Sequence, residues 1–308
     1  MIRISRRLQQ SSINLSHTIH RRFDPKNQGL SPEKSPLIMM HGVLGSKQNF
    51  NSLAKKISST QKREVICLDA RNHGDSPHCD TMSYLEMADD VKNFIENCSE
   101  IDWSFPDSEY EVSGEMKVNL LGHSMGGRTA MAFALNYPEF LEKLIVVDVS
   151  PDNGRTSEIS GAITSYVASM HKVNFNNLHE KYSKASDAKE DVANQLSHVV
   201  KDKGILQFLM MNMVQNNQTK EWSWRANIKA INQQLNEISA FPYVKGQNFT
   251  EQTLFISGEK SPYISLRHYQ LINELFPSSD IKVIEDAGHW VHADKPAEFL
   301  EVLMEFIE

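Results

Sequence analysis

Cysteine is scarce in this sequence, with three among 308 residues and none in a Cys-x-x-Cys pair. Redox-active dithiols and most structural zinc sites need such closely spaced pairs, so the spacing argues against both. Cys67 lies within a short apolar run that is typical of a buried strand. A few cysteines without a pattern indicate a reducing compartment, in which the three are core or incidental residues rather than disulfide partners.

Long apolar runs and an excess of positive charge are missing as well. No run reaches the roughly 18 residues that a membrane-spanning helix needs, so the sequence predicts no transmembrane segment. The formal net charge is −7, and the basic residues form no stripe along the chain, which argues against nucleic acid as a partner. A hydrophobic content of 40% over this length is enough for one sizeable core with an insertion.

Acidic residues are absent from the first 23 positions, which contain five arginines and several serines. An Arg-rich, Ser-rich and acid-poor composition is typical of a mitochondrial transit peptide. Because residues 15–23 could equally form the first strand of the fold, we expect the mitochondrial targeting signal to lie in residues 1–14. The predicted location is mitochondrial, with the matrix as the expected compartment, and a disordered basic tail on a cytoplasmic protein is the alternative.

Short apolar runs typical of buried strands alternate with helix-like segments along most of the chain. The strand-like runs are residues 36–40, 65–68, 118–121, 144–147, 253–256 and 281–284. This alternation predicts parallel strand pairing and an α/β fold, with a mostly parallel central sheet and helices on both faces. In such sheets the active site lies at the carboxyl ends of the strands.

Between residues 152 and 244 the strand pattern stops, and segments rich in Met, Asn and Gln take its place. The segments expected to be helical are 163–170, 190–200, 206–214 and 225–238. We expect an α/β core of residues 15–151 and 245–308, with residues 152–244 as a helical cap insertion over the sheet edge. An acidic, aromatic segment at 99–115 is expected to be a surface insertion.

The central motif is Gly122-His-Ser124-Met-Gly126, which follows the apolar run 118–121 and precedes a helix-like segment. A strand, a sharp turn and a helix in this order form a nucleophile elbow, in which small neighbours allow the serine a strained backbone. The turn presents the hydroxyl of Ser124 above the sheet edge. An ordinary glycine-rich turn shares the five-residue pattern, but the flanking strand and helix favour a nucleophile.

A serine hydroxyl is a poor nucleophile at neutral pH and needs a base, which in turn needs a carboxylate to orient it. His289 is the expected base because it follows the last strand-like run in an Ala-Gly-His-Trp loop, whereas His292 lies nearer the final helix. Two carboxylates, Asp148 and Glu259, follow strand-like runs closely. We prefer Asp148, which follows the strand next to the nucleophile strand, and keep Glu259 as the alternative.

An acyl-transfer site also needs two backbone N–H donors for the oxyanion. Met125, at the start of the helix after the elbow, is the first expected donor. Val43 is the second, with Leu44 as the alternative, because Gly42 permits close approach of the backbone after the first core strand.

The polar loop Asp69-x-Arg71-x-His73-Gly-x-Ser76 follows another strand-like run. Its spacing suits a metal site poorly, so we expect no bound metal. We expect Arg71 and His73 to brace the loops beneath the active site instead. The serine mechanism needs no cofactor, and none is predicted.

Together these motifs are similar to those of the α/β-hydrolase superfamily, from about Leu15 to the C-terminus. Segments 41–51, 69–77, 122–127, 147–151 and 287–296 resemble the family of alpha/beta hydrolase domain-containing protein eleven and its bacterial esterase relatives. The resemblance implies the α/β-hydrolase fold, a mitochondrial location in eukaryotes, and hydrolysis of acyl esters that include acylglycerols and acyl thioesters. Ser261 is a departure, because most enzymes of this type carry the acid at this place, and it leaves the acid dependent on Asp148.

The sequence therefore predicts a serine carboxylic-ester hydrolase of the esterase or lipase type, with a small-molecule acyl ester or thioester as substrate. An acyltransferase would use the same triad, with an alcohol in place of water. A non-catalytic binding protein on a hydrolase fold is a further alternative. Such proteins usually lack the nucleophile or the base, and this sequence retains both. The sequence leaves protein partners unknown.

Overall fold

The structure is a computed structural model that describes residues 12–21, 34–101, 117–152, 158–243 and 245–308. Most of the expected transit peptide and most of the expected surface insertion at 99–115 lie outside the described residues. The expectations for these two segments therefore stay predictions.

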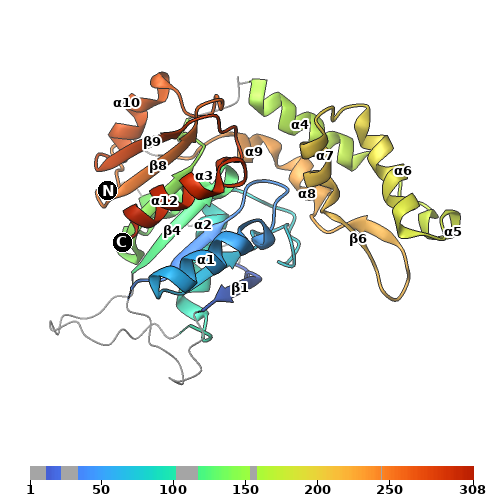
Figure 1. Cartoon of the computed structure of the whole chain (residues 1–308), viewed down its shortest axis with the longest axis horizontal. Coiled ribbons are helices and arrows are strands. Elements are labelled where there is room, and N and C mark those ends of the chain that lie inside the picture. The colour runs from blue at the N-terminus through green and yellow to red at the C-terminus, as the bar shows by residue number, and fades with distance from the viewer. Residues whose placement is uncertain (1–11, 22–33, 102–116, 153–157, 244) are drawn as a thin grey trace, which may run out of the picture.

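A seven-stranded sheet forms the centre of the molecule (Figure 1). In the order in which they pair, the strands are β1 (His17–His20), β3 (Val65–Leu68), β2 (Leu37–Met40), β4 (Val118–His123), β5 (Leu141–Val147), β8 (Thr253–Gly258) and β9 (Ser279–Ile284). The strand β1 pairs antiparallel with β3, and the other neighbours in the sheet pair in parallel. The predicted α/β fold with a mostly parallel sheet is confirmed.

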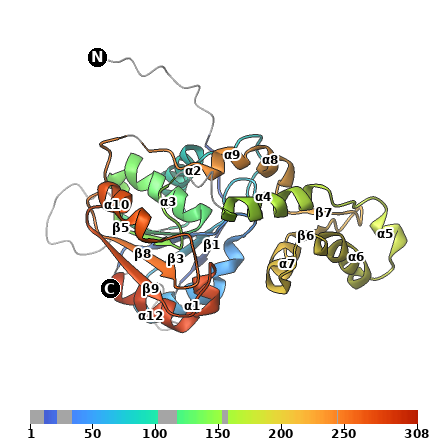
Figure 2. The same cartoon turned by 90° about the horizontal axis from the view of Figure 1, so that it is seen from above.

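Each central strand contributes side chains to two apolar cores, because successive side chains of a strand point to opposite faces of the sheet. In β2, Leu37 and Met39 join one core, and Ile38 and Met40 join the other. The helices over the first core are α1 (Asn51–Gln61), α11 (Val291–Asp294) and α12 (Pro296–Phe306), and those over the second are α2 (Tyr84–Asn97), α3 (Met125–Asn136) and α10 (Leu266–Leu275). Figure 2 shows the two helical layers on either side of the sheet.

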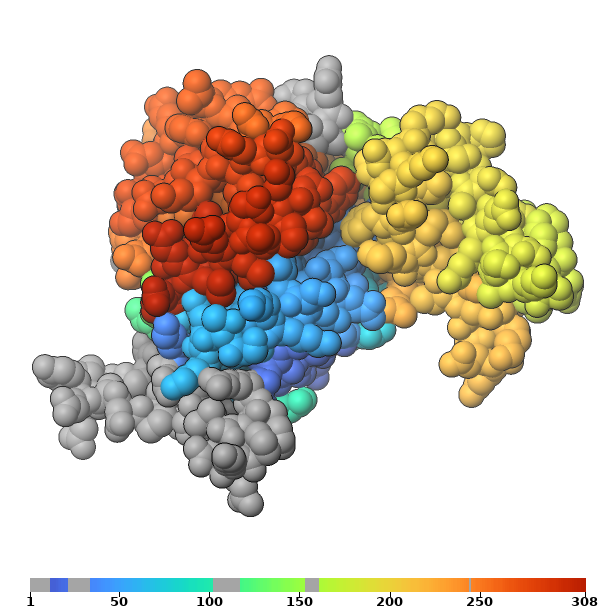
Figure 3. Space-filling model, in the orientation of Figure 1, coloured from blue at the N-terminus to red at the C-terminus, as the bar shows by residue number. Residues whose placement is uncertain are grey.

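The chain between β5 and β8 forms a group of short helices with one hairpin beside the core (Figures 1 and 3). Its elements are α4 (Glu158–His171), α5 (Leu178–Lys181), α6 (Ala185–Ser197), α7 (Lys203–Met210), β6 (Met213–Gln215), β7 (Trp222–Trp224), α8 (Ile228–Gln233) and α9 (Leu235–Ser239). None of the helices that the structure describes, here or in the core, is long and apolar enough to cross a membrane.

One expectation for this segment is wrong: the helix predicted over 206–214 ends at Met210, and the next residues form the hairpin β6–β7. Met213 and Trp222, which lie at opposite ends of the paired register, are buried in a small core of their own with Leu178 and Val192. Burial of these large side chains against neighbouring helices outweighs the weak local preference for a helix.

Backbone contacts at two glycines hold β4, α3 and β2 together. A Cβ atom on Gly122 would lie 2.0 Å from the carbonyl oxygen of Gly126, and one on Gly126 would lie 2.4 Å from that of Met40. No side chain fits into either space, so the first turn of α3 can pack directly against the ends of the two strands. This packing brings the residues that follow β2 and β4 to one edge of the sheet.

We expect Gly122→Ala to lower the free energy of unfolding by about 1–3 kcal/mol, because the added methyl group overlaps the backbone of Gly126. Gly161 in α4 is the matched control, since it is exposed and a Cβ there would meet nothing within 4 Å. Gly161→Ala should raise the free energy of unfolding by up to about 1 kcal/mol through helix propensity. Urea denaturation measures both changes, and equal stabilities of the two variants would contradict the packing argument.

Candidate active site

Ser124 lies between β4 and α3 in a strained backbone conformation. Its φ is 54° and its ψ is −115°, a region that residues with a side chain rarely adopt. The Ser124 amide donates to the Val147 carbonyl at 3.0 Å, and the Arg128 amide donates to the Ser124 carbonyl at 3.0 Å. These bonds hold the turn, and the side chain stays half-buried at the surface of a pocket. This is the geometry of a nucleophile elbow.

Asp148 and His289 are in direct contact, with Oδ2 and Nδ1 2.7 Å apart. Asp148 follows β5, has a positive φ of 51°, and is fully buried. His289 follows β9 and keeps 15% of its side-chain surface exposed. An Nδ1–H that donates to a buried carboxylate fixes the tautomer and the orientation of the ring, and it leaves Nε2 as the basic atom.

The end of β8 and the loop after it support the Asp148 carboxylate. The Gly258 amide donates to Oδ1 at 3.1 Å, and the Ser261 hydroxyl donates to Oδ2. Ser261, which stands where an acid was expected from the resemblance, thus binds the carboxylate of Asp148, which follows β5. The Glu259 carboxylate is exposed and accepts a hydrogen bond from the Asp286 amide at 2.9 Å. The structure therefore brings Asp148 to His289 and turns Glu259 to the surface.

His289 lines the same pocket as Ser124, and two neighbours hold it there. The Nε2–H of His123 donates to the His289 carbonyl at 2.9 Å, and the ring of Tyr263 stacks on the imidazole with centroids 3.9 Å apart. The side chains of Ser124 and His289 form no direct hydrogen bond in this structure. Bonds of this kind often tighten only in the complex with substrate.

His292, three residues after His289, lies in α11 and is buried in the wall of the same pocket. Its ring packs against Phe50 and His123, with centroids 4.9 and 4.8 Å away. Burial lowers the pKa of His292 to about 4, and the neighbouring imidazole of His289 acts in the same direction. Its Nδ1 has no hydrogen-bond partner among the described residues. It lacks the carboxylate contact that His289 has.

The two expected oxyanion donors lie beside Ser124. Val43 lines both pockets that Ser124 lines, and Met125 is the first residue of α3. The Leu44 amide, the alternative donor, is already bound, because it donates to Nε2 of His73 at 3.0 Å. The amides of Val43 and Met125 donate to no group in the described part of the protein, so both are available to an oxyanion.

Arg71 and His73 brace these loops, as the sequence predicts. Arg71 is buried and pairs with Asp90, with Nε 2.7 Å from Oδ2. Its carbonyl accepts the Nδ1–H of His73 at 2.9 Å, which leaves Nε2 free to accept from Leu44. Burial lowers the pKa of His73 to about 3, so the ring is neutral at pH 7 and can serve as an acceptor. A chain of contacts thus runs from α2 to the loop after β2.

No metal centre is formed by these polar loops. Within the described ranges, no three His, Cys, Asp or Glu side chains are grouped so that they could hold a metal ion.

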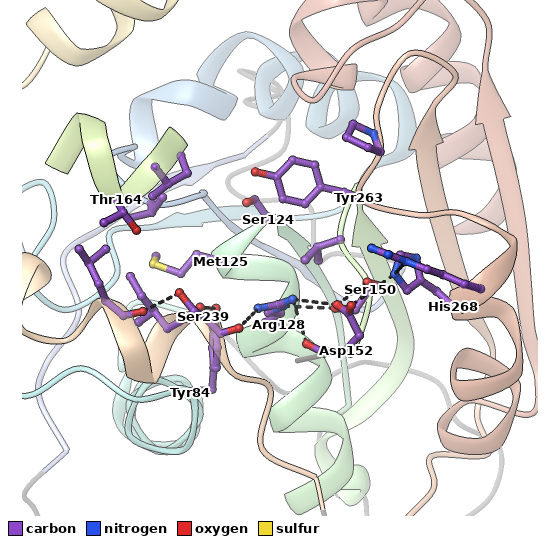
Figure 4. Close-up of a pocket in the computed structure, with 17 residues that line it drawn as sticks. Tyr84, Ser124, Met125, Arg128, Ser150, Asp152, Thr164, Ser239, Tyr263 and His268 are labelled. Carbon is purple, nitrogen blue, oxygen red and sulfur yellow. Dashed lines mark hydrogen bonds and ion pairs between the residues drawn. The ribbon is translucent and has the colours of Figure 1, made fainter. Parts of the chain in front are cut away.

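Two pockets open from Ser124, and they share Val43 and Ile163 as well. The first holds about 720 Å³ of open space, mouth included, and contains a charged cluster (Figure 4). The second holds about 560 Å³ and has His289 in its wall. Aromatic and aliphatic side chains dominate the second pocket: Phe50, Tyr166, Ile205, Phe208, Leu209 and Trp290. Among the described residues, no Asp, Glu, Lys or Arg lines it.

The charged cluster of the first pocket is centred on Arg128, one helical turn after Ser124. The guanidinium donates to the carbonyls of Asp152 and Ser239, each at 3.0 Å, and lies 3.2 Å from the Asp152 carboxylate (Figure 4). His268 Nε2 is 3.3 Å from the same carboxylate. Sequence reasoning missed this cluster, because its members come from α3, from the loop after β5 and from α10. An arginine in an otherwise apolar helix was the one local signal.

The comparisons with known proteins agree with this architecture. A model of the alpha/beta hydrolase fold family matches residues 35–103 and 111–296. The chain is 39% identical over 273 residues to "sn-1-specific diacylglycerol lipase ABHD11" of Xenopus laevis. The aligned region covers 89% of this chain and 80% of that protein. It is 38% identical over 271 residues to the protein of the same name from Mus musculus, with coverage of 88% and 80%.

Among solved structures, "Marine microorganism esterase" superimposes with a TM-score of 0.81 at 29% identity, over 96% of this chain and 100% of that one. The family match extends from before β2 to the start of α12 and includes the elbow at Ser124 and the loop that carries His289. The chain therefore belongs to the α/β-hydrolase family.

Proposed function

We propose that this carboxylic-ester hydrolase works through an acyl-enzyme on Ser124. The Oγ attacks the carbonyl carbon of an ester or thioester while His289 Nε2 takes its proton, and the amides of Val43 and Met125 stabilise the oxyanion. The tetrahedral intermediate then expels the alcohol or thiol, which receives the proton from His289. Water attacks the acyl-enzyme with His289 again as the base, and the carboxylic acid leaves.

The contact between Asp148 Oδ2 and His289 Nδ1, at 2.7 Å, is the observation that carries this proposal. The buried carboxylate stabilises the imidazolium that forms when the base accepts the proton of the hydroxyl. The shared pocket of Ser124 and His289 and the strained turn at Ser124 support the same roles. An ordinary glycine-rich turn has no need of this arrangement.

The substrate class that we propose is an acylglycerol or an acyl thioester. The name of two relatives, sn-1-specific diacylglycerol lipase, supports the first of these. The apolar pocket beside His289 supports a substrate with a hydrocarbon portion, because burial of hydrocarbon there contributes about 25 cal/mol per Å². An alcohol in place of water in the second step would make the reaction an acyl transfer, which the same residues could carry out.

We also propose a mitochondrial location, with residues 1–14 as the targeting signal. The support is the composition of the first 23 residues, which are rich in arginine and serine and lack acidic residues.

Ser124→Ala should lower kcat/KM by at least about 10³-fold, because the variant cannot form the acyl-enzyme. The measurement is hydrolysis of p-nitrophenyl esters, acylglycerols and acyl thioesters of varied chain length by both proteins. A fluorophosphonate probe should label folded wild-type protein on Ser124 and leave the variant unlabelled. Lack of labelling of the wild type would exclude the acyl-enzyme, and new ester outpacing free acid in the presence of added alcohol would make the enzyme an acyltransferase.

Asp148→Asn should lower kcat by about 10³- to 10⁴-fold, since an amide cannot stabilise the imidazolium or hold the required tautomer. Glu259→Gln is the matched control, because this carboxylate is exposed and the hydrogen bond that it accepts comes from the Asp286 amide. It should change kcat by less than about twofold. Steady-state kinetics on one ester, with circular dichroism to verify folding, compares the two. The reverse ordering would make Glu259 the acid.

A fluorescent protein fused behind residues 1–23 should enter mitochondria in eukaryotic cells. Replacement of Arg3, Arg6 and Arg7 by glutamine should leave the fusion in the cytoplasm, because the positive charge of the targeting signal is lost. Fluorescence microscopy with a mitochondrial dye distinguishes the two, and a cytoplasmic signal from the unmodified fusion would support the alternative location.

A further inference from the structure

The proposed base has an aromatic ring stacked on its face. The ring of Tyr263 lies 3.9 Å from that of His289, centroid to centroid, with 14° between their planes. The other rings around His289 are tilted: His123 at 43° and 4.7 Å, and Trp290 at 66° and 5.5 Å. Among these neighbours, Tyr263 is the one that covers a face of the imidazole.

The loop that carries the ring is tied to the acid. The Ser261 hydroxyl donates to Asp148 Oδ2 and also accepts from the Tyr263 amide at 3.4 Å. One hydroxyl therefore links the carboxylate beneath His289 with the backbone of the residue above it. Tyr263 also lines the first pocket, and Figure 4 shows it beside Ser124. The ring thus contacts the proposed base and lines a pocket that Ser124 also lines.

We propose that Tyr263 is a positioning residue that stabilises the imidazolium form of His289 through the face of its ring. This inference rests on the proposed function, in which the proton of Ser124 Oγ moves to His289 Nε2 as the Oγ–carbon bond forms. The face of an aromatic ring carries negative charge density and attracts a cation that lies against it. The interaction is stronger in the transition state than in the neutral ground state, as a catalytic effect requires.

The other neighbours of His289 suit this role less well. Burial holds the pKa of His123 well below its usual range, and that of His292 at about 4, so both are neutral at pH 7. As neutral rings they add no repulsion to a charged His289, and the ring of His123 is tilted by 43° to that of His289. Asp148 stabilises the positive charge of the imidazolium from its Nδ1 edge, and Tyr263 stabilises the same charge from one face of the ring.

The first test compares two substitutions with the wild type. Tyr263→Phe keeps the ring and removes the hydroxyl, so kcat/KM should stay within about twofold of the wild type. Tyr263→Leu keeps a half-buried apolar side chain and removes the ring, so kcat/KM should be about 2- to 30-fold lower than in Tyr263→Phe. In Tyr263→Leu, the acid limb of the pH profile of kcat/KM should move to lower pH by about 0.4 to 1.5 pH units, since a less stabilised imidazolium loses its proton at lower pH.

A second series separates the charge of the ring from its shape. Phenylalanine with one, two or three ring fluorines at position 263 keeps the stacking area and withdraws electrons from the face stepwise. The logarithm of kcat/KM should fall with each fluorine. The same series at Tyr269, which is exposed on α10 and outside the pockets, is the control and should be flat. The series also decides the matter if the leucine variant fails to fold.

A flat response at position 263, or a loss with Tyr263→Phe as large as with Tyr263→Leu, would overturn the proposal. In the first case the ring would act by shape alone, and in the second the hydroxyl would carry the effect. Failure of the proposed function itself has a different signature, because Ser124→Ala would then remain as active as the wild type, whatever the response at position 263.

Discussion

The arrangement of the site depends on one buried carboxylate, that of Asp148. A charge without access to water is costly unless hydrogen bonds satisfy it. Here the Gly258 amide, the Ser261 hydroxyl and the imidazole of His289 converge on its two oxygens. The donors come from the end of β8 and from the loops that follow β8 and β9, whereas Asp148 follows β5. The need to satisfy one anion thus fixes three loops relative to one another and presents the imidazole to the pocket of Ser124.

The parts of this structure that could be predicted from the sequence are those with a local cause. Each buried strand is a short apolar run, and Ser124 lies in a five-residue turn whose glycines are explained by backbone contacts shorter than any side chain allows. The choice between Asp148 and Glu259 had no local cause, because both follow strands. Packing separates the two: the side chain of Asp148 is fully buried in contact with His289, and that of Glu259 is exposed.

Features that arise from contacts distant in sequence could not be predicted. The hairpin β6–β7 forms because Met213 and Trp222 find a small core among helices that the local pattern does not place. The polar end of the first pocket unites Arg128 with Asp152 and Ser239, which are far along the chain from it. The stacking of Tyr263 on His289 likewise depends on how two loops after neighbouring strands meet.

The hydroxyl of Ser261 has an evolutionary consequence. It touches the same carboxylate oxygen that binds the imidazole, so the loops after β5 and β8 reach one point in space from two directions. An ancestor with acidic side chains on both loops could lose either one and keep a charged group under the histidine. A carboxylate from either loop could therefore contact the imidazole of His289 while Ser124 and His289 keep their places. Relatives that differ at this position need not differ in chemistry.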